Sequence, residues 1–400
     1  MYHQVVIIGA GPVGGRLATE LASRGISTLM IEEHAEIGRP FQCAGLVNPP
    51  AMNMVNLHET ILQDIDGALI HSPSGIMVPV GRDGKTRTHV VCRKRFDQGV
   101  VAQAMSAGAH LWLLSKPLDA TVTNDGVELK IEREGEIIDV KCDLIIGADG
   151  AHSWTRRHFR LGRPKEMMIG FQADVSGLTG KSNWLEMYTG DDVAPGLFAW
   201  VIPSGNNTHR IGVWSRPQDL DGRSVEQCYD ALLSHPLWKE RFAGVKEIAR
   251  YCGPVPCGVI QKPFKDRVMV IGDAAGMAKP TTGGGIGPGF RQVEFIIEKL
   301  EKAIVNGKLR ASDLATVCKP FKAFRKEQDR ARALRDLLVS TPDDAALDAH
   351  FELFNKPEVL EIINREGDIE HPVPLGMTLL RKVPGFRKLA LKAGFKLIFA

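Results

Sequence analysis

Three closely spaced glycines near the N-terminus have the spacing needed to hold a phosphorylated ligand. Gly9, Gly11 and Gly14 follow the apolar run "QVVII" and precede a stretch with helical periodicity. Such glycines allow a tight turn and let a pyrophosphate approach the free N–H groups at the start of the helix. Glu32 ends the next apolar run, 23 residues after Gly9, where its carboxylate can accept a hydrogen bond from a ribose hydroxyl. The pattern predicts a dinucleotide site for FAD or NAD. A glycine-rich turn of an unrelated parallel sheet would leave Glu32 unexplained.

Two later segments each place an acid just after a short apolar run. "LIIGADG" puts Asp149 after a predicted strand over 144–146, and "VMVIGD" puts Asp273 after a predicted strand over 268–271. The carboxyl ends of parallel strands gather at one edge of an open α/β sheet, where such folds bind ligands. A further segment, "CRKRFDQGVV", places Arg93 directly before a predicted helix. We expect these side chains to converge on the same ligand.

In this order, the segments resemble the signature of FAD-dependent enzymes of the glutathione-reductase superfamily, in the branch that includes p-hydroxybenzoate hydroxylase. The resemblance implies that the cofactor is FAD, that Asp273 contacts its ribityl or pyrophosphate part, and that Arg93 contacts it as well. No second G-x-G-x-x-G follows a predicted strand, so we do not expect a separate NAD(P)H domain. The electron donor stays open between NAD(P)H and a ferredoxin-type protein.

The loop "KPTTGGGIGPG" resembles one that lies beside the isoalloxazine ring in the geranylgeranyl reductase family. Backbone that passes close to a flat ring leaves no room for side chains. Its amides and the following helix N-terminus can also stabilise negative charge on reduced flavin. Related hydroxylases carry a similar proline and glycine pair, so the loop alone does not exclude them. The residues predicted to face the flavin are Pro280, Gly283, Gly284, Gly285 and Ile286.

The stretch "PGLFAWVIP" matches in spacing a P-x-x-[YF]-x-W-x-[FI]-P pattern on the substrate sheet of geranylgeranyl reductases. Phe198, Trp200 and Ile202 would share one face of a strand, because side chains alternate between the two faces. This face either packs into the domain core or lines an apolar tunnel to the flavin. The flavin segments on either side favour the tunnel, with Phe198 and Trp200 as candidate catalytic residues.

Cys43 lies about a dozen residues beyond the ribose acid Glu32, in "QCAGLVNP". Geranylgeranyl reductases commonly have a Cys-Gly pair here, at the reactive face of the flavin, and the resemblance places Cys43 and Ala44 beside the cofactor. This chain differs, because Ala44 separates Cys43 from Gly45. An ordinary thiol is mostly protonated at neutral pH and can hold or relay a proton. A buried structural thiol is the alternative.

Membership of this family would imply reduction of isoprenoid C=C bonds, in archaeal-type ether lipids or in chlorophyll precursors. An aromatic face suits this reaction, because ring quadrupoles stabilise positive charge without offering a nucleophile. The substrate would be a polyprenyl (geranylgeranyl) lipid. Two alternatives remain: an FAD monooxygenase that hydroxylates a hydrophobic substrate, and a membrane-surface electron-transfer flavoprotein.

The order of the expected strands and helices around these residues indicates an α/β fold with three parts. A Rossmann-like FAD-binding domain is expected over residues 1–165 together with 256–305, and a substrate domain with a mixed or antiparallel sheet over 166–255. Residues 306–400 are expected to form a C-terminal helical region with a basic tail. Its helices over 306–370 would cover the sheet or shape the tunnel.

Charge is unevenly divided along the chain. The net charge is +3, yet residues 371–400 contain six basic and no acidic side chains, which leaves 44 basic and 47 acidic ones in the first 370 residues. This distribution argues against a nucleic-acid partner. In the tail, Lys388, Lys392 and Lys396 form a helical stripe that either contacts anionic headgroups at a membrane surface or belongs to a helix docked on its own domain.

Seven scattered cysteines suit a reducing compartment rather than a disulfide framework. Cys252 and Cys257 have no second ligand pair nearby, so no metal is expected. No apolar run approaches the ~18–20 residues needed to span a bilayer. The expected location is cytoplasmic, with peripheral membrane contact through the tail.

Overall fold

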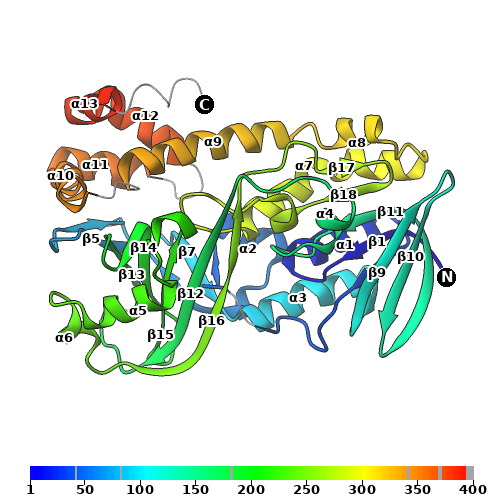
Figure 1. Cartoon of the computed structure of the whole chain (residues 1–400), viewed down its shortest axis with the longest axis horizontal. Coiled ribbons are helices and arrows are strands. Elements are labelled where there is room, and N and C mark those ends of the chain that lie inside the picture. Colours follow the sequence, from blue (N-terminus) through cyan, green and yellow to red (C-terminus); the bar gives the residue numbers. More distant parts are fainter. Residues whose placement is uncertain (41–42, 82, 181–182, 340–342, 368–371, 393–400) are drawn as a thin grey trace.

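The computed structural model describes residues 1–40, 43–81, 83–180, 183–339, 343–367 and 372–392, with side chains to residue 388 (Figure 1). Two large sheets lie side by side along the long axis of the molecule, and the helix α9 runs above both. None of the helices in these ranges is long and apolar enough to cross a membrane.

The first sheet has eight strands and carries the N-terminal glycines. Its central strands are parallel, in the order β18-β11-β1-β2-β8. The long β11 continues beyond this core as an antiparallel extension with β10 and β9. The bounds are β1 (Tyr2–Ile8), β2 (Thr28–Ile31), β8 (His110–Trp112), β9 (Ser115–Val122), β10 (Val127–Arg133), β11 (Glu136–Gly147), β17 (Phe264–Lys265) and β18 (Val268–Val270).

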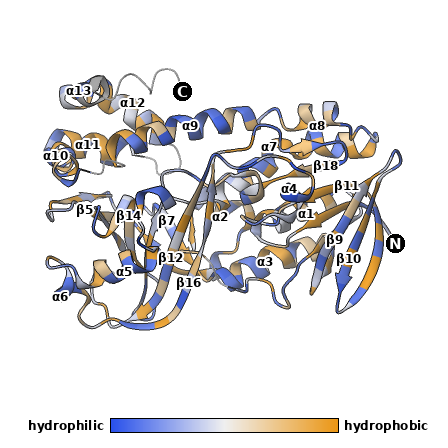
Figure 2. Cartoon of the chain, viewed as in Figure 1, coloured by the Kyte–Doolittle hydropathy of each residue, from blue (hydrophilic) through white to orange (hydrophobic). Residues whose placement is uncertain are grey.

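Helices cover this sheet because its central strands are apolar on both faces, as buried parallel strands are. The last four residues of β1 and all of β2 and β18 are buried. Figure 2 shows the hydrophobic colour concentrated in these central strands. The covering helices on one side are α1 (Pro12–Ala22), α3 (Arg93–Ser106) and α7 (Ile286–Val305), with α4 (Trp154–His158) and α8 (Ala311–Val317) nearby.

The second sheet has seven strands in the order β16-β12-β15-β14-β13-β5-β6. Its bounds are β5 (Gly67–His71), β6 (Met77–Val80), β12 (Glu166–Ser176), β13 (Trp184–Gly190), β14 (Ala194–Pro203), β15 (Thr208–Ser215) and β16 (Lys246–Cys257). The predicted substrate domain began at residue 166. Its sheet also takes β5 and β6 from the part assigned to the FAD-binding domain, because β5 pairs in parallel with β13.

The two faces of this second sheet have different partners. On β14, Ala199 and Val201 pack into a core with α5 (Val225–Ser234) and α6 (Lys239–Phe242). Phe198, Trp200 and Ile202 point to the opposite face, as the strand periodicity predicts. The helix α5 begins with a capping box in which Ser224 and Gln227 satisfy each other's backbone N–H groups.

A small sheet and a helical region complete the fold. The small sheet contains β3 (Leu46–Val47), β7 (Thr88–Val91) and β4 (Ile61–Ile65), next to α2 (Pro49–Val55). The helical region contains α9 (Phe321–Leu338), α10 (Asp344–Phe354), α11 (Pro357–Glu366), α12 (Pro372–Lys382) and α13 (Pro384–Lys392). Figure 1 shows α10 to α13 gathered at one end of α9.

The basic tail is only partly described. Phe386 in α13 is buried, with its ring centroid 5.1 Å from that of Phe354 in α10, so α13 docks on the helical region. Lys388 is exposed. The side chain of Lys392 and all of Lys396 lie outside the described residues, so the predicted lysine stripe stays a prediction.

Candidate functional site

One continuous cavity of about 1430 Å³ extends from the glycine turn of the first sheet to the open face of the second. It exceeds the ~300–1,000 Å³ typical of a site for one small ligand. The predicted residues that line it are Gly9, Gly11, Glu32, Cys43, Ala44, Arg93, Asp149, Phe198, Trp200, Asp273, Gly283, Gly284, Gly285 and Ile286. Gly14 and Pro280 do not line it. The fold thus brings most of the predicted site residues to one space.

The glycine turn after β1 requires glycine at two positions and opens to the cavity at a third. Gly9 has φ +97°, and a Cβ there would lie 2.5 Å from the carbonyl oxygen of Ala148. A Cβ on Gly14 would lie 2.2 Å from the carbonyl oxygen of Gly9, so Gly14 permits the turn rather than touching a ligand. Nothing lies within 4 Å of a Cβ built on Gly11, which faces open space at the start of α1. This is the room that a pyrophosphate needs.

Glu32 is held at the end of β2 by backbone and side-chain donors. Its Oε2 accepts a hydrogen bond from the Ala10 N–H at 3.0 Å, and its Oε1 lies 2.6 Å from His34 Nδ1. Oε1 also accepts a hydrogen bond from the His34 N–H at 3.2 Å. These contacts fix the carboxylate at the cavity wall, where Oε2 keeps a second lone pair for a hydroxyl group.

Asp149 caps the short helix α4. Its carboxylate accepts hydrogen bonds from Ser153 Oγ at 2.6 Å and from the Thr155 N–H and Oγ1 at 2.8 and 2.9 Å. Burial raises the pKa of this carboxyl group, although these donors act in the opposite direction. Because its oxygens are occupied, Asp149 shapes the cavity edge mainly through the turn that it holds.

Asp273 and Arg93 both line the cavity, close enough for their charges to interact. Burial raises the pKa of Asp273 to about 6, and the positive charge of Arg93 lowers it in part. Arg93 forms two hydrogen bonds with Asp97 one helical turn later, Nε to Oδ1 at 3.0 Å and Nη2 to Oδ2 at 2.8 Å. This paired guanidinium is fixed beside the cavity, where its other N–H groups can reach an oxygen of a ligand.

The glycine-rich loop before α7 forms a tight ring. The Gly283 N–H donates to the Lys279 carbonyl at 2.8 Å, and the Lys279 N–H donates to the Gly284 carbonyl at 3.1 Å. A Cβ on Gly285 would lie 2.6 Å from Asp273 Oδ1, so the loop also requires glycine beside this acid. The hydroxyl of Thr282 is buried and has no hydrogen-bond partner among the residues that the structure describes. A polar ligand group at this position would supply that partner.

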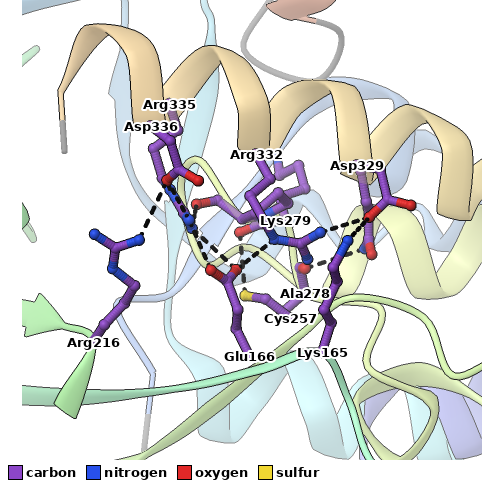
Figure 3. Close-up of polar contacts among 12 residues, drawn as sticks. Lys165, Glu166, Arg216, Cys257, Ala278, Lys279, Asp329, Arg332, Arg335 and Asp336 are labelled. Atoms are coloured by element: carbon purple, nitrogen blue, oxygen red, sulfur yellow. Dashed lines mark hydrogen bonds and ion pairs between the residues drawn. The ribbon is translucent and has the colours of Figure 1, made fainter. Parts of the chain in front are cut away.

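Pro280 holds the loop from behind rather than lining the cavity. It is buried, and its carbonyl accepts a hydrogen bond from Arg335 Nη1 of α9 at 3.0 Å. Figure 3 shows Arg335 next to Glu166 and Asp336 in a network that joins α9, the loop and the start of β12. The contribution of Pro280 at a flavin face stays a prediction.

Three aromatic rings form one wall of the cavity. The ring centroid of Phe198 lies 5.5 Å from that of Trp214 and 6.4 Å from that of Trp200, both edge to face. Gly212 makes room for Trp200, because a Cβ there would lie 2.2 Å from the indole. Trp214 stands opposite Phe198 on β15 and beside Gly283. Trp214 was not predicted from the sequence, because its place in the wall depends on the register of β15 against β14.

Cys43 lies at the cavity beside the Arg93 guanidinium, half-buried, and its Sγ accepts a hydrogen bond from the Gly45 N–H at 3.3 Å. The backbone after Cys43 is held by Arg210, which donates hydrogen bonds to the carbonyls of Ala44 at 2.7 Å and Val91 at 3.2 Å. The buried Arg210, on the aromatic sheet, was not predicted. The thiol therefore occupies a defined position between the two sheets.

The two cysteines considered for a metal site differ in their exposure to solvent. Cys252 is exposed, whereas Cys257 is buried with its Sγ 3.6 Å from the Lys279 carbonyl oxygen. Burial raises the pKa of Cys257. Within the described ranges, no group of three or more metal-ligating side chains is arranged to hold an ion.

Known proteins share both the sequence pattern and the fold. Residues 2–316 match the FAD binding domain family. Digeranylgeranylglycerophospholipid reductase from Methanocaldococcus jannaschii is 32% identical over 71% of this chain and 73% of its own length. A second reductase of that name, from Methanopyrus kandleri, is 31% identical over 72% of this chain and 74% of its own. The chain belongs to the geranylgeranyl reductase family.

Solved structures agree with this family on the fold. A geranylgeranyl bacteriochlorophyll reductase-like protein from Thermoplasma acidophilum superposes with a TM-score of 0.84, at 24% identity, over 98% of this chain and 99% of that one. A flavin-dependent brominase superposes with a TM-score of 0.73, at 18% identity, over 95% of this chain and 99% of that one. As a geranylgeranyl reductase family member, the protein is an oxidoreductase whose cofactor is FAD.

The chain's residues fit this cofactor. Gly11 leaves open space at the N-terminus of α1, and Glu32 lines the cavity. The glycine-rich loop contains the buried Thr282 hydroxyl, for which the described part of the chain offers no hydrogen-bond partner. In this geranylgeranyl reductase family member, the N-terminal elements would hold the nucleotide half of FAD, and the 279–285 loop would lie against its ring. The remaining cavity extends along the aromatic wall.

Proposed function

We propose that this protein saturates C=C bonds of geranylgeranyl or related polyprenyl chains, most directly those of archaeal-type ether lipids. The observation that carries the proposal is the continuity of one cavity from the glycine-rich loop to a long apolar compartment. A polyprenyl chain is apolar along its length, so it needs such a compartment, whereas a small polar substrate does not.

The compartment lies between the open face of the second sheet and the C-terminal helices. Strands β5, β6, β13 and β14 supply one wall, and α9 to α12 supply the other. Side chains that represent the two walls are Ile70, Leu185 and Met187 from the sheet, and Leu338, Phe354 and Leu379 from the helices. Burial of a prenyl chain here would be favourable by ~25 cal/mol per Å² of apolar surface.

The aromatic wall suits the charge that alkene reduction creates. Bound FAD would supply hydride in this chemistry. The more substituted carbon, which accepts the hydride, develops tertiary-carbocation character as its neighbour gains a proton. The faces of Phe198, Trp200 and Trp214 can stabilise that positive charge without trapping it. Cys43 is the thiol that lines the cavity near Arg93 and can hold the proton that the second carbon needs.

The test is anaerobic product analysis. The FAD-loaded protein is reduced with dithionite and mixed with digeranylgeranylglycerol phospholipid, and the lipid is then analysed by mass spectrometry. We expect a gain of two hydrogens per bond reduced, with Trp200→Ala retaining FAD but losing this gain. Gain of oxygen under air would instead identify the monooxygenase alternative. Electron transfer to quinone with the lipid unchanged would identify the electron-transfer alternative.

A further inference from the structure

A second hollow, of about 1040 Å³, shares no lining residue with the cofactor cavity. It is formed by residues 160–165, by residues 258–265 and by α8 and α9, and we refer to it as the basic groove. Its lining includes six basic side chains and one acid: Arg160, Arg163, Lys165, Lys262, Lys265, Arg325 and Asp329.

Most of the positive charge in the basic groove is uncompensated. Lys165 pairs with Asp329 at 3.0 Å. Arg160, Arg163, Lys262 and Lys265 are exposed, and none of the four forms an ion pair with a residue in the described ranges. This concentration contrasts with the rest of the first 370 residues, where acids outnumber bases. Such a surface attracts an anionic partner and raises its association rate.

Residues that line the basic groove are joined to the segment between Asp273 and Thr281 by backbone and side-chain hydrogen bonds. The Ile260 N–H donates to the Ala275 carbonyl at 3.1 Å. Gln328 of α9 accepts from the Val259 N–H at 3.0 Å and donates to the Met277 carbonyl at 3.0 Å. The segment held in this way connects Asp273 with Thr281, which both line the cofactor cavity. Packed backbone thus separates the groove from that cavity.

The helix α9 also connects the two sites through its polar side chains. Figure 3 shows Lys165 and Asp329 at one end of this network and Arg335 at the other. Arg335 Nη1 donates to the Pro280 carbonyl at 3.0 Å. Between the two ends, Arg332 bonds both Asp329 and Glu166. A partner seated in the groove would therefore rest on a rigid, hydrogen-bonded layer behind the loop.

We propose that the basic groove docks an acidic one-electron carrier protein that reduces the bound FAD. The proposal rests on the proposed function only in that alkene reduction consumes electrons that must be replaced. Two reduced carriers would each lose one electron, and the oxidised cofactor would gain two electrons with protons from solvent. Hydride transfer from a nicotinamide requires reacting atoms ~3–3.5 Å apart. The backbone layer prevents such contact from the groove, whereas an electron can cross it.

The experiment compares two triple charge reversals in the full-length, FAD-loaded protein. The groove variant is Arg163→Glu, Lys262→Glu and Lys265→Glu. The control is Lys239→Glu, Lys246→Glu and Lys356→Glu, which makes the same charge change at exposed sites on α6, β16 and the start of α11. Figure 1 shows α6 and α11 at the opposite end of the molecule from α8 and β17. The probe is plant-type [2Fe–2S] ferredoxin, an acidic one-electron carrier.

Two readouts are measured under anaerobic conditions. The first is the affinity of oxidised ferredoxin for the oxidised protein by calorimetry. The second is the second-order rate of FAD reduction by reduced ferredoxin. We expect the groove variant to lower both by about tenfold or more at low salt, with the difference shrinking at high salt, and the control to match the native protein. Reduction by dithionite and the FAD absorption spectrum should be the same in all three proteins.

Equal ferredoxin affinities and rates in the groove and control variants would overturn the proposal. So would a groove variant that loses reduction by NADPH while keeping reduction by ferredoxin, because the groove would then serve a dinucleotide. A native protein that accepts electrons from ferredoxin in a groove-dependent way, yet leaves geranylgeranyl lipid unsaturated, would support the groove and contradict the proposed function.

Discussion

The indole of Trp214 lies against Gly283, so that a Cβ at Gly283 would stand 3.2 Å from the Trp214 ring. Trp214 belongs to the second sheet, and Gly283 belongs to the loop that opens α7. This contact joins the aromatic wall to the glycine-rich loop, and both residues line the same cavity. Under the proposed function, the Trp214 ring would lie where a substrate double bond approaches the cofactor.

Replacing Trp214 tests whether this ring contributes to the reaction. We expect Trp214→Leu to slow alkene reduction by the pre-reduced protein about tenfold, because cation–π stabilisation of ~1–2 kcal/mol is lost. Trp214→Phe should recover most of the rate, because it keeps an aromatic face. The measurement is single-turnover product formation at saturating lipid. Equal rates in the Leu and Phe variants would assign Trp214 a packing role.

Arg335 tests the connection from α9 to the loop, with Arg332 as its matched control. Both arginines bond Glu166, at 2.7 Å from Arg332 Nε and 2.8 Å from Arg335 Nη2, yet only Arg335 reaches the Pro280 carbonyl. We expect Arg335→Lys to weaken FAD binding about tenfold and to shift the FAD reduction potential, since a buried charge-assisted hydrogen bond contributes ~1.5–3 kcal/mol.

Arg332→Lys should lower thermal stability to a similar degree and leave both FAD properties unchanged. The measurements are FAD titration, redox titration and Tm. If the two variants changed FAD affinity equally, the network would be a general stabiliser of α9 rather than a support for the loop.

Asp273 makes a pH-dependent contribution to stability. Its pKa in the folded protein is about 6, above the ordinary value of 3.8, so the folded state keeps a proton that the unfolded chain has lost between those values. Stability therefore falls as pH rises through this window. We expect Asp273→Asn to raise the Tm of FAD-free protein at pH 7 relative to the native chain, with the gain fading towards pH 4. A Tm difference that stays constant from pH 4 to 8 would exclude this burial cost.

Cys43 tests the proton supply. We expect Cys43→Ala to lower alkene reduction by ~10²-fold, the lower end of general acid catalysis, without changing the rate at which dithionite reduces FAD. Cys43→Ser should retain part of the activity, because a hydroxyl can also carry a proton. Full activity in both variants would leave Cys43 as a structural thiol that supports the turn at Ala44.

The positions of the glycine turn and of Glu32 at the cavity could be predicted from the sequence because their determinants are local. Gly9, Gly11 and Gly14 lie in a single turn between β1 and α1, and Glu32 follows within the same βαβ unit. The alternation of Phe198 and Trp200 along β14 was predicted correctly for the same reason. Short sequence separations and fixed periodicities carry this information.

The remaining features depend on contacts between distant segments. β5 joins the second sheet by pairing with β13, which lies more than 100 residues later in the chain. No local sequence pattern predicts that pairing. Trp214 reaches the loop only because β15 pairs with β14 in a particular register. In the sequence, Arg335 is one of many charged residues of α9. Its hydrogen bond to the Pro280 carbonyl depends on how the helix packs against the glycine-rich loop. A single sequence contains no direct record of such long-range packing.

The most direct test of the central claim is a single-turnover oxidation of the reduced cofactor by an alkene. The protein's FAD is reduced with one equivalent of dithionite under argon, mixed with digeranylgeranylglycerol phospholipid, and followed by flavin absorbance. We expect oxidised flavin to return in the absence of oxygen, with one saturated bond formed per flavin. Absorbance that stays at the reduced level until air is admitted, with the lipid double bonds intact, would contradict it.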